Sequence, residues 1–343
     1  MGVVKTLFDE LIGFFGLGSV IDIFKTGNYG VLLTFKGILS VIGPIVPLLL
    51  VLEIINGLIH KRIKKSDYKV PLLTYVFNRF ISKFISITAV IFCIGLFQKY
   101  AIFRTSLTWY WFGYSYIVWE FAHFIYHYLA HKVRLLWCLH ATHHTPESMN
   151  LSVTYAHFFL EAPYANIIRT SICILFGVNP EMLFIIMFID SIWGAFIHVS
   201  EDFIKEVNLG PLNKIILMPS HHRVHHGKNP LYMDTNFCSL LNIWDHAFGT
   251  FKEEEANIPL EYGITRKVDP NSFLDAYFGE FVVLFKDVKK APGLKNKLAY
   301  IFMPPGWSHT GKHATAKSAK TEFLKNSAKN GNAECAGFKS VSA

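Results

Sequence analysis

The chain has 343 residues, of which 52% are hydrophobic and only 17% are charged, and its mean hydropathy is +0.32. Because soluble domains carry about a quarter charged residues, this composition argues against an ordinary soluble domain and favours a protein with membrane-spanning segments. The net charge of +8 indicates an anionic membrane surface and no nucleic-acid partner, since the basic residues gather between apolar runs and near the C-terminus.

The N-terminal residues 1–29 are expected to lie at a membrane interface. Four large apolar side chains would share one side of an amphipathic helix in this segment. They are Leu7, Leu11, Phe14 and Phe15.

The first predicted membrane span covers residues 30–59. It exceeds the roughly 20 residues that the hydrocarbon core of a bilayer requires, and Gly43 and Pro44 predict a kink near its middle. A basic cluster at residues 60–65 follows directly. Positive charge beside a span places this loop in the cytoplasm.

Four further apolar segments follow in the chain. They cover residues 84–97, a stretch from residue 107 into a histidine-rich region, residues 158–178 and residues 182–197, with a turn at residues 179–180. If the spans alternate in direction, the histidine-rich region and the segment after residue 197 emerge on the cytoplasmic side. The predicted fold is therefore all-α, an integral-membrane helical bundle with a cytoplasmic helical cap that holds a polyhistidine dimetal site.

The polar segments after the last span complete the predicted organisation. Residues 202–251 predict a cap of short helices interrupted by breakers such as Pro219. The membrane-embedded domain is accordingly placed at residues 30–252, followed by a membrane-surface segment at residues 253–303. Residues 304–343 are rich in lysine and poor in apolar residues, and we expect a disordered tail there.

Three clusters of histidine have the spacing of metal ligands. Residues at i, i+3 and i+4 share one face of a helix, so each cluster can direct two or three ring nitrogens at one point. A lone histidine in an apolar helix is more often a satisfied polar residue, but three clusters on one side of the bundle favour a metal site. The clusters are His127-x-x-x-His131, His140-x-x-His143-His144 and His222-x-x-His225-His226.

The number of clustered histidines favours two metal ions. A structural zinc needs four ligands and a catalytic zinc three, so eight histidines are enough for a dinuclear centre. Imidazole suits zinc, copper, iron and nickel alike, so the ligands alone leave the metal open. A metal pair at the edge of a membrane bundle is well placed to attack an aliphatic C–H bond, which iron with O₂ can do. The five cysteines form no C-x-x-C pair and give no support for a thiolate site.

The order and spacing of the clusters resemble a known superfamily. HxxxH, HxxHH and HxxHH, with eight residues between the first two, are similar to the histidine boxes of the membrane-bound fatty acid hydroxylase and sterol desaturase superfamily of diiron enzymes. Further strings resemble its alkylglycerol monooxygenase branch, and the resemblance covers about residues 45 to 252. These strings lie at residues 137–144, 208–212, 219–227 and 243–251.

The resemblance implies two iron ions that insert one oxygen atom from O₂ into a C–H bond of a membrane lipid, with ether-lipid cleavage as one outcome. It adds His198, at the end of the last span, to the eight clustered histidines. The implied ligand set is His127, His131, His140, His143, His144, His198, His222, His225 and His226.

Supporting polar residues are expected around these ligands. Glu120 stands where relatives usually have aspartate, and a carboxylate there would fix the tautomer of a ligating imidazole. Asp234, Asn236 and Asp245 could act similarly, or could form the capping and turn hydrogen bonds of the cap. His221, beside a ligand, is likewise expected in a supporting position.

The chain needs a reductant from outside. It has no G-x-G-x-x-G fingerprint and no haem-binding signature, so the electrons would come from tetrahydrobiopterin, which animal relatives use, or from a small redox protein that docks on the basic cytoplasmic face.

Two alternatives remain open at this point. A desaturase or hydroxylase of a sterol, carotenoid or fatty acyl chain would use the same ligands. A membrane metal transporter or scaffold would place its ligands along a path through the bilayer, whereas these histidines gather at one end.

Overall fold

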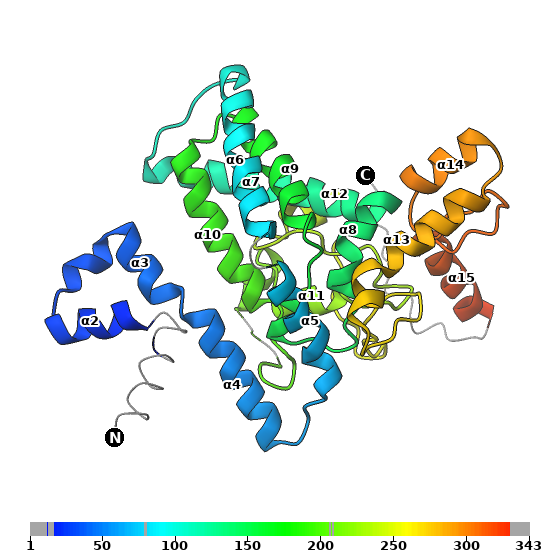
Figure 1. Ribbon diagram of the computed structural model, residues 1–343, viewed down its shortest axis with the longest axis horizontal. Helices are drawn as coiled ribbons and strands as arrows, with labels where there is room; N and C mark the ends of the chain where they lie inside the picture. The colour runs from blue at the N-terminus through cyan, green and yellow to red at the C-terminus, as the bar shows by residue number, and fades with distance from the viewer. Residues whose placement is uncertain (1–11, 13–16, 79–80, 206, 208, 330–343) are drawn as a thin grey trace.

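The computed structural model describes residue 12 and residues 17–78, 81–205, 207 and 209–329 (Figure 1). Its regular structure is helical, and the described residues form no strand beyond two isolated bridges. The all-α prediction is therefore confirmed. The four apolar side chains expected on the first amphipathic helix lie outside the described residues.

The first expected span is divided between two helices. α3 (Phe35–Ile42) and α4 (Ile45–Ile59) meet at a turn formed by Gly43 and Pro44, because proline lacks an amide hydrogen and constrains its neighbours. The predicted kink is thus a break. Among the described residues, Ser40–Ile59 is the one stretch long and apolar enough to cross a membrane, and Phe84–Tyr100 is apolar but shorter.

The centre of the molecule is α7 (Trp109–Lys132), which packs against α8 (Arg134–His144), α9 (Glu161–Leu175) and α10 (Pro180–Phe196). Apolar side chains of α7, α9 and α10 form the largest buried cluster. A single extended residue, Val133, separates α7 from α8. The two histidine-bearing helices are in contact with each other.

A buried carboxylate ties α4 to this core. Glu53 is 2% exposed and accepts hydrogen bonds from the backbone amides of Leu151 (2.8 Å) and Ser200 (2.7 Å). Because an unpaired buried amide is costly, this carboxylate holds the backbone at Leu151 and at Ser200 against α4.

The C-terminal helices gather at the end of the molecule opposite α2 and α3 (Figure 1). The expected disordered tail is wrong for its described part: residues 316–329 are helical, and Phe323 packs against the cluster of Val224, Leu231 and Tyr232. Alanine and lysine favour a helix, and a few apolar side chains suffice to dock it. Residues 330–343 lie outside the described part. The C-terminal helices are α13 (Phe273–Lys290), α14 (Gly293–Phe302) and α15 (Ala316–Lys329).

Shorter elements complete the described chain. The remaining helices are α2 (Gly18–Thr26), α5 (Lys65–Asn78), α6 (Ile81–Phe97), α11 (Pro219–His225) and α12 (Ile243–Phe248), and the 3₁₀ turns are η1 (Tyr29–Leu33), η2 (Gln98–Tyr100), η3 (Leu151–Tyr155) and η4 (Gly210–Lys214).

Candidate metal centre

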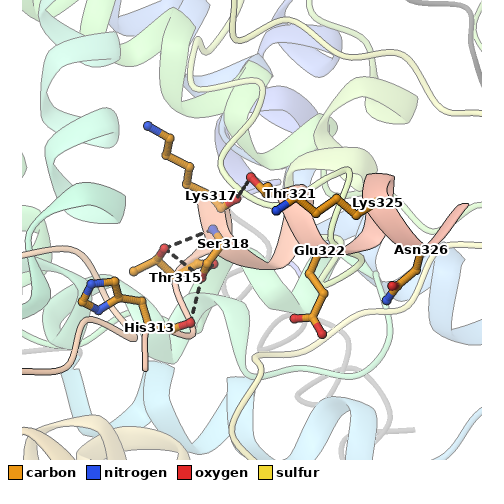
Figure 2. A pocket seen from close by; sticks show the side chains of 8 residues that line it. All are labelled: His313, Thr315, Lys317, Ser318, Thr321, Glu322, Lys325 and Asn326. Carbon is orange, nitrogen blue, oxygen red and sulfur yellow. Dashed lines mark hydrogen bonds between the residues drawn. The ribbon is translucent and has the colours of Figure 1, made fainter. Parts of the chain in front are cut away.

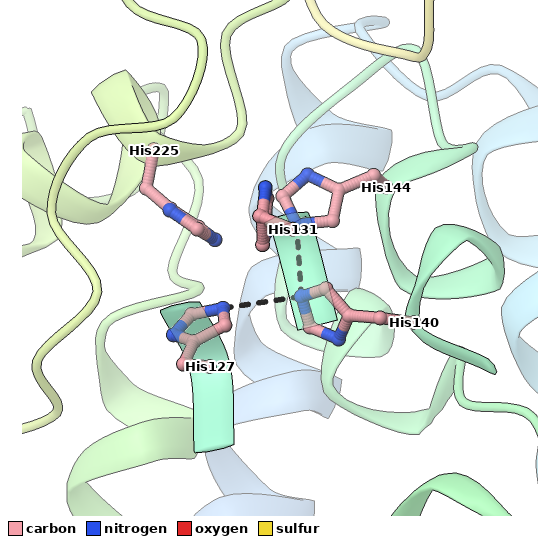
Figure 3. Close-up of side chains that lie close together, drawn as sticks. All are labelled: His127, His131, His140, His144 and His225. Carbon is pink, nitrogen blue, oxygen red and sulfur yellow. Dashed lines mark hydrogen bonds between the residues drawn. The ribbon is translucent and has the colours of Figure 1, made fainter. Parts of the chain in front are cut away.

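The structure brings together all nine histidines of the expected ligand set. They form two buried groups, and within each group one ring nitrogen per residue lies within 4.8 Å of the others. Figure 3 shows the side chains of the first group pointing toward a common centre. Group one is His127, His131, His140, His144 and His225, and group two is His143, His198, His222 and His226.

The two HxxHH clusters each contribute histidines to both groups. On α8, His140 and His144 are four residues apart and share one face, whereas His143 points into group two. The short helix α11, which begins at Pro219, directs His222 into group two and His225 into group one. Each of these two clusters thus contributes to both groups, which places the groups next to each other.

Hydrogen bonds fix the tautomers of four histidines. Their Nδ1 atoms lie 2.5–2.9 Å from oxygens that can only accept, so Nδ1 carries the proton and Nε2 presents a lone pair. The pairs are His127 with the Phe237 carbonyl (2.9 Å), His140 with the Glu161 carboxylate (2.6 Å), His198 with the Gly194 carbonyl (2.5 Å) and His225 with the Thr235 carbonyl (2.7 Å).

The spacing of the Nε2 atoms fits metal coordination. Imidazole nitrogens bind a metal such as zinc at about 2.0–2.1 Å, so two ligands at a right angle lie about 3 Å apart. Five pairs of Nε2 atoms lie 2.9–3.1 Å apart. In the His127–His140 pair both Nε2 atoms carry a lone pair, and two lone pairs at this distance repel each other unless a cation lies between them. The pairs are His127–His140, His140–His144, His143–His198, His198–His222 and His222–His226.

Further observations agree with this arrangement. The Nε2 atoms of His131 and His225 are buried and have no hydrogen-bond partner in the described part of the chain. Burial lowers the pKa of His225 to about 3 and that of His198 to about 3. Neutral imidazole is the form that binds a metal, so these side chains are held in the state that coordination requires.

Glu120 does not lie where the sequence placed it. Within the described chain its carboxylate bonds none of the nine histidines and instead accepts from the backbone amides of Ser239, Leu240 and Leu241, at 3.1, 2.8 and 3.0 Å. The reason is its position two turns before His127, roughly 10 Å along the helix. The expected direct contact with a ligating imidazole is therefore wrong, and Glu120 fixes a loop.

Asp245 fixes the preceding part of the same loop. Its two carboxylate oxygens each accept a backbone amide at 2.8 Å, from Phe237 and Cys238. Asp245 and Glu120 together hold five consecutive backbone amides, those of residues 237–241. They therefore fix the position of the Phe237 carbonyl, which accepts a hydrogen bond from His127.

Asp234 lies beside a histidine of group one, which agrees with the first of the two alternatives left open for it. Its Oδ1 atom is 3.4 Å from Nδ1 of His131, and its Oδ2 atom accepts from Lys132 Nζ at 2.5 Å. The backbone of Asp234 is in the left-handed region, with φ of 62°, which is costly for a residue other than glycine. This conformation places the carboxylate against α7.

Asn236 serves as a connector in the cap. Its side-chain amide donates to the carbonyls of His221 (2.8 Å) and Lys252 (2.7 Å), and its Oδ1 atom accepts from the Lys252 amide. His221 accepts from the Met218 amide at 3.1 Å and so caps α11. Asn236 follows the turn and capping alternative, whereas His221, which was expected to support a ligand, caps a helix. Neither belongs to the two histidine groups.

Sequence reasoning missed Glu161 and His157. Glu161, the first residue of α9, bonds His140 through one oxygen and His157 through the other. The available signal was an acidic residue four positions after a histidine at the start of an apolar segment. An isolated pair of this kind is common at helix ends, and therefore no role was assigned to it.

His123 also lies near the groups but outside them. Its Nδ1 atom is 3.7 Å from an Asp190 oxygen and 3.4 Å from Arg169. It therefore belongs to a buried polar network between α7, α9 and α10.

A cavity of about 1010 Å³ reaches the histidines. His131, His144, His225 and His226 line its inner side, and α13 contributes Glu280 and Val283. Its outer side is formed by a segment that we call the C-terminal wall. The wall consists of Tyr300, Met303, Pro304, Pro305, Gly306, Trp307, His313, Ala314, Thr315, Ala316, Lys317, Ser318, Ala319 and Glu322.

A second hollow, of about 520 Å³, lies along α15 (Figure 2). Its lining includes Thr321, Lys325 and Asn326 but none of the nine histidines. The hydrogen bonds drawn there join residues of α15 or of the turn just before it, such as Thr321 Oγ1 to the Lys317 carbonyl at 2.8 Å and Ser318 Oγ to the His313 carbonyl at 3.0 Å. We therefore regard the larger cavity as the one connected to the chemistry.

Comparison with known proteins shows a similarity to lipid-hydroxylating enzymes. Residues 112–250 match the family model described as fatty acid hydroxylase, a range that contains all nine histidines. The chain is 32% identical over 188 residues to alkylglycerol monooxygenase of Xenopus tropicalis, covering 55% of this chain and 40% of the relative. It is 31% identical over 250 residues to the human enzyme of that name, covering 68% of this chain and 54% of the relative.

A bacterial relative extends the comparison. The ornithine lipid hydroxylase of Rhizobium tropici is 29% identical over 152 residues, covering 44% of this chain and 45% of the relative. No solved structure matches the chain. The chain thus spans about half the length of the curated relatives that it matches, and its match to the fatty acid hydroxylase model lies in residues 112–250.

Proposed function

We propose that this protein is an O₂-dependent, non-haem diiron monooxygenase that hydroxylates a membrane lipid. One observation supports this most strongly: two adjacent buried groups present converging Nε2 atoms 2.9–3.1 Å apart. The names of the relatives, alkylglycerol monooxygenase and ornithine lipid hydroxylase, support the reaction class and a lipid substrate.

The residues of the chain would act mainly by positioning. Group one would hold one ion and group two the other, and when bound the iron pair would supply O₂ activation and the transfer of one oxygen atom to a C–H bond. The Phe237, Thr235 and Gly194 carbonyls keep three ligand nitrogens unprotonated. Burial of the histidines excludes water from the reacting atoms.

The choice of iron follows from the reaction. The ligands alone do not distinguish iron from zinc, but an aliphatic C–H bond has no acidic proton to remove, and a redox-active metal with O₂ can oxidise it. A transporter would need ligands along an open path, whereas all nine histidines are buried in two closed groups.

Ether-lipid cleavage is one form of the proposed reaction. Hydroxylation of the carbon beside an ether oxygen gives a hemiacetal, which separates into an aldehyde and an alcohol. The same oxygen insertion at another carbon would give a stable hydroxylated lipid.

The proposal includes a location and a reductant. We place residues 30–252 as a catalytic domain in a membrane, with several spans and the histidines on the cytoplasmic face. The stretch Ser40–Ile59 supports membrane association. Electrons would come from tetrahydrobiopterin or from a small redox protein.

Comparative lipidomics tests this function. Cells with the protein, grown in air, should contain lipids with the mass of one added oxygen or should lose ether lipids, and cells carrying His143→Ala should not. A product that differs only by loss of two hydrogens would instead identify a desaturase. Purified protein should hold about two irons per chain, and protein with zinc alone that is active without O₂ would refute the redox mechanism.

A further inference from the structure

Glu161 occupies a position that the proposed chemistry has not yet used. It is 2% exposed, and its carboxylate accepts three hydrogen bonds from side chains. Oε1 lies 2.6 Å from His140 Nδ1 and 3.0 Å from the Tyr126 hydroxyl, and Oε2 lies 2.8 Å from His157 Nδ1. In the other three histidines with a fixed tautomer, which are His127, His198 and His225, the acceptor of the Nδ1 proton is a backbone carbonyl.

His157 extends this contact to the second group. Its ring stacks on the ring of His143, with centroids 4.3 Å apart and an interplanar angle of 14°. His143 belongs to group two and lies 3.1 Å from His198 through their Nε2 atoms. A single carboxylate is thus hydrogen-bonded to a ligand of group one and to the ring that stacks on a ligand of group two.

We propose that Glu161 and His157 are positioning residues that connect the two metal sites, with Glu161 orienting His140 and His157 supporting His143. A carboxylate that accepts from Nδ1 fixes the ring of a ligating histidine and makes its other nitrogen a stronger donor to the metal. His140 Nε2 lies 3.1 Å from both His127 and His144, so its orientation sets the geometry of three ligands.

The loop that carries His157 is held from two other helices. Asn78 of α5 donates to the His157 carbonyl at 2.5 Å, and the Tyr277 hydroxyl of α13 donates to Asn78 at 2.6 Å. The same hydroxyl accepts from the Phe159 amide at 2.8 Å. The position of His157 is therefore set independently of Glu161, which lets the two residues be tested separately.

The test uses cobalt(II), whose absorption spectrum reports its ligands. Full-length protein in detergent is stripped of metal and titrated with the metal ion alone. Replacement Glu161→Gln should weaken the cobalt affinity of group one by about 10–100-fold and shift its absorption bands, and Glu161→Asp should restore part of both. A Glu161→Gln protein with the wild-type titration curve and spectrum would overturn the proposal.

His157→Phe tests the proposed role of His157. It also tests the proposal as a whole if the Glu161→Gln protein does not fold. It keeps a ring that can stack on His143 but removes the Nδ1–H that Glu161 accepts. We expect a cobalt affinity about tenfold weaker and a shifted spectrum, and an unchanged titration and spectrum would contradict the connection.

Glu53→Gln is the matched control, because Glu53 is also a 2% exposed carboxylate but accepts from backbone amides. It should leave the cobalt spectrum unchanged, and an equal shift would show general destabilisation and refute the proposal. The inference rests on the proposed metal centre. Wild-type protein that binds no cobalt or iron would overturn the proposed metal centre and this inference together. Normal metal binding by the wild type and by the Glu161 and His157 variants would overturn only the proposed roles of Glu161 and His157.

Discussion

The histidine groups and the C-terminal wall line the same cavity but are held in different ways. The histidines are fixed by short hydrogen bonds to buried acceptors, such as His140 to Glu161 at 2.6 Å. The wall is docked by few apolar contacts, among them Phe323 of α15. Regions with few buried contacts open at lower free energy. From this comparison we expect the ligands to require rigidity and the wall to affect which molecules reach them.

The largest loss of activity is expected from substitutions in the two histidine groups. Replacing His143 or His225 by alanine removes one ligand from group two or group one, and activity should fall by about 100-fold or more, with loss of about one iron per chain. Activity and iron content measured on purified protein test this. The exposed His60 provides the control, as His60→Ala should change neither quantity, and retained turnover in either ligand variant would refute the assignment.

Removing the wall should give a different result. Deletion of residues 306–343 takes away much of the outer side of the cavity, so kcat/KM should fall about tenfold, which is about 1.4 kcal/mol, while iron content is retained. Deletion of residues 330–343 is the control and should have little effect. Wild-type kcat/KM in the longer deletion would show that the wall does not shape the site.

A smaller effect, on stability, is expected from a substitution of Glu120, which fixes the loop at residues 239–241. Glu120→Gln replaces an acceptor of three amides with a group that also donates, and the free energy of unfolding should fall by about 1–3 kcal/mol. Thermal or denaturant unfolding measures this. Glu181→Gln, at an exposed position of α10, should change stability much less, and equal losses would contradict the role given to Glu120.

The smallest effect is expected at the docking contact of the wall. Phe323→Ala removes a partly buried ring from the cluster around Tyr232, at a cost of about 1 kcal/mol. Limited proteolysis should then cut α15 faster while the fragment with the histidines remains resistant. Unchanged cleavage of α15 would show that Phe323 does not dock it.

The sequence predicted the features that depend on local spacing. The helical class, the interruption at Gly43 and Pro44, which was predicted as a kink, and the eight clustered histidines follow from apolar runs, proline and the i, i+3 and i+4 rule. His198 was added by the family resemblance. The structure brings these nine side chains together, whereas the binding of two irons stays a prediction.

The missed features depend on tertiary packing. The division of each HxxHH cluster between two groups requires the angle between helices, which spacing does not contain. Glu161 and its partner His140 are 21 residues apart, and the amides that Glu120 holds are about 120 residues away. The tail was expected to be disordered because its composition is polar, yet Phe323 provides a docking contact for α15.

The single extended residue between α7 and α8 fixes the phase between the two helices. One residue inserted early in α8 would turn the following side chains by about 100° and advance them by about 1.5 Å. His140 and His144 would then face away from His127, although every histidine would still be present. The number of residues between His131 and His140, which is eight, therefore sets the orientation of the second cluster relative to the first. Inserting or deleting one residue in this interval should reduce metal binding more than most substitutions within it.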